Sequence, residues 1–202
     1  MFLGAQVALY PMSDRFVDVI LGGLNAMAPY RDQLRIETDD LSTLMVGPPE
    51  ALFPAMRDLF CGAARTGAHV VLAATLSRGC PGEPDDPTCA TPRLDGPRAP
   101  VETRIAEGPA RGAAAEPGDG AAAAQRWLYP LGVDASMAEI ADCIAFLRES
   151  GVHERAKNFC TKLRGDAGPL FAAVEEAFLG FGAPEAHVAA DLKVSANSPS
   201  AR

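Results

Sequence analysis

The sequence predicts an α+β fold of two tandem βαββαβ units, each an antiparallel sheet with helices on one face. Three observations lead to this prediction. The heptad AQVALYP at residues 5–11 recurs as AQRWLYP at residues 124–130. From Thr43 onward, identical residues recur at a constant spacing of 118 positions. Strand-like and helix-like patterns follow the same order in both copies. We therefore expect a duplicated domain: repeat 1 at residues 1–80, a linker at 81–122 and repeat 2 at 123–198.

Repeat 1 opens with an alternating segment that is rich in strand-forming residues. Apolar residues at helical spacing then predict two helices. Asp39-Asp40 is expected to form the turn between two short strands. In order, the expected elements are a strand at 6–12, a helix that Pro29 stops, strands at 34–38 and 41–46, a helix opened by residues 47–50, and a strand at 69–77.

Repeat 2 shows the same order of patterns. Asp166 is placed to cap its second helix. Its expected elements are a strand at 125–131, a helix at about 135–149, strands at 153–157 and 159–164, a helix after Asp166, and a strand at 187–195. This order is the split βαβ arrangement of ferredoxin-like domains.

The segment at 81–122 is dense in proline, glycine and alanine and nearly empty of large apolar residues. It cannot bury enough surface to offset its ordering entropy, so we expect a disordered linker or an extended loop. Cys80 and Cys89 at its start could pair under oxidation.

Composition excludes several classes of protein. The formal charge of −8 argues against a nucleic-acid partner, which requires a basic surface. No apolar run is long enough to span a membrane, and the first residues lack the pattern of a signal peptide. The five cysteines are scattered without metal-ligand spacing, which indicates reduced thiols and a cytoplasmic protein. We expect no metal, no cofactor and no catalytic residues, because neither copy supplies a nucleophile with a base.

The charges of repeat 2 suggest which sheet face is open, because charged side chains should not lie under helices. The expected open face of repeat 2 holds Arg126, Leu128, Lys162, Arg164, Asp191 and Lys193. Its equivalents in repeat 1 are mostly apolar: Val7, Leu9, Leu44, Val46, Ala73 and Thr75. An apolar sheet face requires a partner, so we expect a homodimer; stacking of the two sheets of one chain is the alternative.

Polar residues recur on the face that we expect to meet the helices. They are Gln6, Tyr10 and Thr43 in repeat 1, where Ala8 shares this expected face, and Gln125, Tyr129 and Thr161 with Trp127 in repeat 2. Buried polar groups require hydrogen-bond partners. Each set either bonds to neighbouring backbone or lines a small ligand pocket between sheet and helices.

At these residues the sequence resembles the YkoF family of thiamine- and hydroxymethylpyrimidine-binding proteins. The resemblance rests on the duplicated A-Q-x-x-L-Y-P opening and on Ser42-Thr43-x-x-x-Gly47 with Cys160-Thr161-x-x-x-Gly165. It also rests on Ala-His-Val at the start of the last strand of each copy and on Leu-Ser-Arg-Gly-Cys-Pro-Gly at residues 76–82. The motifs cover both repeats but not the linker.

The resemblance implies tandem ACT-like domains, a homodimer and non-enzymatic binding of thiamine or hydroxymethylpyrimidine, with a link to a thiamine-precursor ABC transporter and to precursor uptake or salvage. It implies these ligand-binding residues: Gln6, Tyr10, Ser42, Thr43, Gln125, Trp127, Tyr129 and Thr161. Trp127 would either stack on a ligand or fill the second pocket. The alternative function is an ACT-like regulatory sensor of another small molecule, such as an amino acid.

Overall fold

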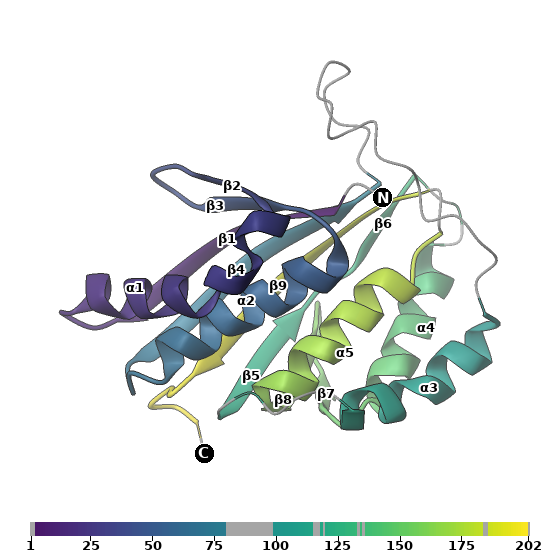
Figure 1. Ribbon diagram of the computed structural model, residues 1–202. Coiled ribbons are helices and arrows are strands. Elements are labelled where there is room, and N and C mark those ends of the chain that lie inside the picture. The colour runs from purple at the N-terminus through teal and green to yellow at the C-terminus, as the bar shows by residue number, and fades with distance from the viewer. Residues whose placement is uncertain are drawn as a thin grey trace.

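The computed structural model describes residues 3–79, 99–114, 118, 120–132, 134, 136–183 and 186–201. In these residues the predicted α+β class is confirmed. The strands form one antiparallel sheet in the order β2-β3-β1-β4-β9-β5-β8-β7, with β6 pairing the first residues of β9. Figure 1 shows the helices gathered on one face of this sheet, while the other face is open.

The elements of repeat 1 follow the predicted order, with one short 3-10 helix added after the first α-helix. They are β1 (Leu3–Met12), α1 (Phe16–Ala26), η1 (Ala28–Gln33), β2 (Arg35–Thr38), β3 (Thr43–Val46), α2 (Pro49–Ala64) and β4 (His69–Arg78).

Repeat 2 repeats the order, and its first strand is assigned as two pieces. Its elements are β5 (Ala121–Arg126), β6 (Tyr129–Leu131), α4 (Ser136–Glu149), β7 (His153–Ala156), β8 (Thr161–Asp166), α5 (Ala167–Gly180) and β9 (His187–Ala196). The predicted cap of α5 is confirmed, because the Asp166 side chain accepts a hydrogen bond from the Gly168 N–H at 2.9 Å.

The two repeats join along β4 and β9 with an approximate two-fold relation. Ala74 pairs with Leu192, which is its own counterpart at the spacing of 118 residues. Two reciprocal side-chain bonds flank this pair: His69 Nε2 lies 3.1 Å from Ser195 Oγ, and Ser77 Oγ lies 3.0 Å from His187 Nε2. The repeats therefore share one continuous sheet and do not stack their sheets face to face.

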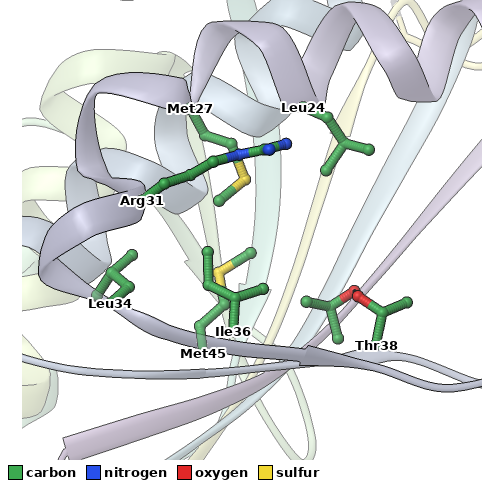
Figure 2. Close-up of a pocket in the computed structure, with 8 residues that line it drawn as sticks. Leu24, Met27, Arg31, Leu34, Ile36, Thr38 and Met45 are labelled. Atoms are coloured by element: carbon green, nitrogen blue, oxygen red, sulfur yellow. The ribbon is translucent and has the colours of Figure 1, made fainter.

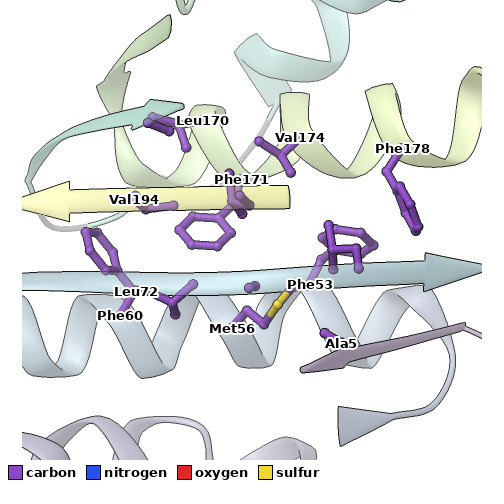
Figure 3. Close-up of a cluster of buried hydrophobic side chains, with 14 of the residues drawn as sticks. Ala5, Phe53, Met56, Phe60, Leu72, Leu170, Phe171, Val174, Phe178 and Val194 are labelled. Carbon is purple, nitrogen blue, oxygen red and sulfur yellow. The ribbon is translucent and has the colours of Figure 1, made fainter. Parts of the chain in front are cut away.

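The helices of the two repeats share one apolar core. Phe53 and Phe60 on α2 contact Phe178 and Phe171 on α5, with ring centroids 6.2 and 6.0 Å apart (Figure 3). These residues are equivalent in pairs, so the contact is again reciprocal. Aromatic burial of this size contributes much of the stability of a small domain.

The strand register corrects the expected faces of the first strand in each repeat. Gln6 pairs with Leu44 and Thr75, whereas Val7 pairs with Thr43 and Ala74. Directly paired residues share a face. Val7 is 2% exposed beneath the helices and Gln6 is exposed on the open face. Gln6 and Thr43 therefore lie on opposite faces, which contradicts their assignment to one pocket wall.

The same correction applies along both first strands. Predicted helix-facing residues that lie on the open face are Gln6, Ala8, Tyr10, Gln125, Trp127 and Tyr129. Predicted open-face residues that lie under the helices are Val7, Leu9, Arg126 and Leu128. The error has one physical cause: Arg126 was expected outside because it is charged, but only 4% of it is exposed.

The segment predicted as a disordered linker contains a helix, α3 (Val101–Ala114). It contacts α4 and α5. Val101 and Ile105 pack against the core, and the Arg104 guanidinium lies 4.9 Å from the Phe181 ring centroid and donates to the Gly180 carbonyl. The prediction was wrong for these residues because two apolar side chains and one arginine suffice to dock a helix on an existing core. Cys80 and Cys89 lie outside the described residues.

Within the part of the chain that the structure describes, we find no helix of sufficient length and apolarity to span a membrane.

Candidate ligand-binding clefts

Each repeat presents a β-hairpin with the same turn. In the β2–β3 hairpin the Asp39 N–H donates to the Ser42 carbonyl at 3.0 Å, and in the β7–β8 hairpin the Lys157 N–H donates to the Cys160 carbonyl at 2.8 Å. Each tip carries one strongly exposed apolar side chain, Leu41 at 79% and Phe159 at 87%. A cleft is associated with each hairpin. The two clefts differ in their position on the sheet, because the larger repeat 1 cavity is lined from the helix-facing side, whereas Gln125 and Trp127 line the repeat 2 cleft from the open face.

The repeat 1 cleft consists of two adjoining cavities of about 450 and 250 Å³ that share Leu24, Thr38, Thr43 and Met45. Figure 2 shows the larger one, with Leu24, Met27 and Arg31 reaching in from the helical side and Ile36, Met45 and Thr38 from the hairpin. Its volume and apolar lining are typical of small-molecule sites.

Polar groups line the repeat 1 cleft at the hairpin. The hydroxyl oxygens of Thr38 and Thr43 lie 3.0 Å apart. Ser42 Oγ accepts a hydrogen bond of 2.6 Å from Gln6 Nε2, which reaches it from the open face. Hydroxyl groups can donate and accept, so this wall can match both an amino group and a ring nitrogen.

Acidic side chains line the outer part of the same cleft. Asp39 and Asp40 both border the smaller cavity. The Asp39 carboxylate accepts hydrogen bonds of 2.8 Å from the N–H groups of Leu41 and Ser42, which lower the pKa of Asp39. The expected role of Asp39 in the turn is confirmed, and its fixed negative charge favours a cationic group nearby.

The repeat 2 cleft has a volume of about 500 Å³ and a different chemistry. Its lining residues are Gln125, Trp127, Arg155, Ala156, Lys157, Asn158, Phe159 and Cys160. Trp127 is partly exposed, and Lys193 Nζ lies 5.6 Å from the centroid of its ring. This wall offers an aromatic surface beside cationic side chains.

Two further features of the described residues concern metal binding and thiol reactivity. No group of three or more metal-ligating side chains occurs there. Cys143 is buried, and burial raises the pKa of its thiol even though Arg126 Nη1 donates to its sulfur at 3.1 Å. A neutral, buried thiol is a poor nucleophile.

Comparison with known proteins identifies the family. The model of the YKOF-related family matches residues 2–83 and 121–201. The chain belongs to this family. It is also 28% identical over 197 residues to a Bacillus subtilis (strain 168) protein named "Putative HMP/thiamine-binding protein YkoF", covering 98% of this chain and 91% of that protein. The resemblance inferred from the short motifs is confirmed.

In this YKOF-related chain, some of the expected site residues line the clefts and others lie outside them. In repeat 1, Tyr10, Ser42 and Thr43 line the cleft, and Gln6 touches it through Ser42. Their grouping at the hairpin, rather than on one sheet face, is what brings them together.

In repeat 2, Gln125 and Trp127 line the cleft, but two expected residues do not. The Tyr129 hydroxyl points to Asp191 at 3.4 Å, and partial burial, with the charge of Asp191, raises the pKa of Tyr129. Thr161 is 6% exposed and pairs with Arg126 on the helix-facing side. Thr161 and Gln125 are therefore separated by the sheet.

Several lining residues of these YKOF-family clefts escaped sequence reasoning. They are Leu24, Met27, Arg31 and Ile36 in repeat 1, and Arg155 and Phe159 in repeat 2. A usable signal was the constant spacing of 118 residues, which already set Leu41 and Phe159 at equivalent turn positions.

Proposed function

We propose that this chain is a non-enzymatic protein that binds thiamine or its hydroxymethylpyrimidine precursor, with one site in each hairpin cleft. The observation that carries the proposal is the presence of two clefts of ligand size at equivalent hairpins of a duplicated fold. The name of the Bacillus subtilis relative supports this choice of ligand.

The chemistry of the repeat 1 cleft suits the proposed ligand. An aminopyrimidine presents ring acceptors and an amino donor, which the hydroxyl groups of Ser42 and Thr43 can match. Apolar side chains such as Ile36 and Met45 can cover the ring, since sulfur makes favourable contacts with aromatic rings. Asp39 and Asp40 would lie near the thiazolium cation of thiamine.

These matches between ligand and cleft suggest which residues would contact the ligand. Tyr10, Ser42 and Thr43 would contact the ligand in repeat 1, with Gln6 orienting the Ser42 hydroxyl. Gln125 and Trp127 would contact it in repeat 2, where Trp127 would offer a stacking surface. No further cofactor enters the proposal.

The proposal also covers the location, the oligomeric state and the cellular role of the protein. The protein would act in the cytoplasm as a homodimer, linked to a thiamine-precursor ABC transporter in uptake or salvage. The homodimer is favoured by exposed apolar side chains on the open sheet face, which include Tyr10 at 53% and Met12 at 56%.

Calorimetric titration tests the binding proposal. Thr43→Val should weaken the binding of hydroxymethylpyrimidine or thiamine to repeat 1 by about tenfold or more, because it removes one hydrogen bond and leaves a polar ligand atom unpaired. Thr75→Val is the matched control, since Thr75 is exposed on the open face and bonds to Asp191 outside the clefts.

Two outcomes would contradict the proposal. One is the absence of saturable heat with both ligands at concentrations well above micromolar. The other is equal loss of affinity in Thr43→Val and Thr75→Val, which would show that the effect of Thr43→Val is not specific to the repeat 1 cleft.

A further inference from the structure

The two hairpin clefts have diverged in charge at the same turn positions. Asp39 and Asp40 line the repeat 1 cleft, and Lys157 and Asn158 take their places in repeat 2 at the spacing of 118 residues. Both hairpins keep the same backbone hydrogen bond across the turn. The substitution therefore changes the charge at the cleft while this hydrogen bond is kept.

The cations of the repeat 2 cleft are available to a ligand. Arg155 and Lys157 line it, and no described residue forms an ion pair with either of them. Their neighbours Lys162 and Arg164 differ, since each lies 2.7 Å from a carboxylate oxygen of Glu154. None of the described residues that line this cleft is acidic. Two unneutralised cations in a concave site favour an anion.

The same cleft presents two aromatic side chains. Trp127 lies in its wall, and Phe159 at the hairpin tip is 87% exposed. In repeat 1 the equivalent positions hold Ala8 and Leu41. Aromatic rings favour the flat face of a heterocycle. The repeat 2 cleft therefore combines aromatic surface and positive charge, both of which the equivalent positions of repeat 1 lack.

We propose that the repeat 2 cleft binds an aromatic heterocycle that carries a phosphate ester, whereas the repeat 1 cleft binds the uncharged or cationic form. The inference rests on the proposed function and specifies the ligand of its second site. The hydroxymethyl group of hydroxymethylpyrimidine can carry such an ester, and phosphate bears about −1.5 to −2 charges at neutral pH. The planar guanidinium of Arg155 can hold phosphate through two hydrogen bonds, with Lys157 as a second charge.

Fluorescence reports on this cleft selectively, because Trp127 is the only tryptophan in the chain. The full chain is titrated with hydroxymethylpyrimidine, with its phosphate monoester and with inorganic phosphate, and calorimetry is run in parallel. The ester should change the fluorescence of Trp127 with a Kd about tenfold or more below that of hydroxymethylpyrimidine, and the difference should shrink as salt is added. Inorganic phosphate should not saturate the signal at concentrations that saturate with the ester.

A variant that places repeat 1 residues at the equivalent positions of repeat 2 tests the role of charge directly. Lys157→Asp with Asn158→Asp installs the residue pair of repeat 1, and it should remove the preference for the ester. Arg148→Gln on α4 is the control, since it removes one exposed positive charge outside the cleft, and it should keep the preference.

Three results would overturn the inference: equal or tighter binding of hydroxymethylpyrimidine at Trp127, inorganic phosphate as tight as the ester, or an unchanged preference in the double variant. Any of these can occur while calorimetry still detects hydroxymethylpyrimidine or thiamine, in which case the proposed function stands and only the inference fails. If neither fluorescence nor calorimetry detects binding of any probe, the proposed function and this inference are both contradicted.

Discussion

Two buried arginines on the helix-facing side of the sheet differ in how their charge is satisfied. Arg78 donates three hydrogen bonds of 2.7 to 3.1 Å to the carbonyl groups of Phe178, Phe181 and Gly182 at the end of α5. A cation is favourable there because the carbonyl ends of a helix carry partial negative charge. Arg126 is also buried, but its Nε and Nη2 atoms have no hydrogen-bond partner among the described residues.

The same substitution should therefore have opposite effects at the two arginines. Arg78→Met should lower the free energy of unfolding by about 3–5 kcal/mol, because it leaves buried carbonyl groups unpaired and removes the three hydrogen bonds that Arg78 donates to them. Arg126→Met should leave it unchanged or raise it by about 1–3 kcal/mol, because it removes unpaired buried donors while keeping volume. Repeat 1 already has Val7 at the position of Arg126.

Urea denaturation followed by circular dichroism measures both variants. An equal loss of stability in Arg78→Met and Arg126→Met would show that the Arg126 guanidinium has a stabilising partner, and would refute this reading of its burial.

At the scale of elements, the packing of α2 on α5 holds the two repeats together and carries one perturbed carboxyl group. Glu175 on α5 is largely removed from water and lies near Glu176 and Glu50. Desolvation, with repulsion from these two carboxylates, raises the pKa of Glu175 to about 7 despite the nearby Arg57. A carboxyl group with a raised pKa stabilises the fold in its protonated form. Its contribution is complete below about pH 4.5 and declines as the pH rises through 7.

Glu175→Gln should therefore stabilise the protein at high pH only. We expect a gain in the free energy of unfolding of about 1–2 kcal/mol at pH 8, after allowance for partial exposure, and little change at pH 4. Glu149→Gln on the exposed side of α4 is the control and should not alter the pH dependence. Thermal unfolding between pH 4 and 8 measures both, and an equal effect of Glu175→Gln at both ends would contradict the raised pKa.

The strands show where sequence reasoning succeeded and where it failed. Element types and order follow directly from periodicity, and the duplication made each repeat a check on the other. The phase of β1 and β5 was wrong because a charged residue was taken as a marker of the open face. Arg126 is buried, so the alternation was shifted by one residue along both strands.

The candidate site was only partly predictable, because its residues come from several elements and its apolar residues look like core residues in the sequence. Recurrence selected Tyr10 and Thr43, and the family resemblance selected Ser42, but these residues meet at a hairpin rather than on a sheet face. Helical residues of the cleft such as Leu24 and Met27 look like ordinary core residues in the sequence, because apolar periodicity is the same for a packed core and a pocket wall. Only the position of the hairpin over α1 distinguishes the two.

At the scale of the whole molecule, duplication creates one sheet with a long open face. Its exposed apolar side chains lie at equivalent strand positions of both repeats: Tyr10 and Met12 in one, Tyr129 and Leu131 in the other, each at least 41% exposed. A patch repeated in this way suits a two-fold contact in which repeat 1 of one copy faces repeat 2 of the other.

The dimer can be tested by sedimentation. The chain should sediment as a dimer at micromolar concentration, and Met12→Glu with Leu131→Glu should convert it to a monomer, because charged groups cannot be buried in an apolar contact without a large cost. Leu21→Glu on α1 is the control, since Leu21 is 50% exposed on the helical side. A wild-type monomer, or dissociation by Leu21→Glu alone, would place the contact elsewhere or remove it.

The central claim is that each hairpin cleft is a ligand site. A crystal structure of the full chain grown with hydroxymethylpyrimidine tests it most directly. The account predicts a pyrimidine ring beside Thr43 and Ser42 in repeat 1, and against Trp127 when the phosphate ester is supplied. A ligand bound at any other place on the molecule, with both hairpin clefts filled only by water, would contradict it.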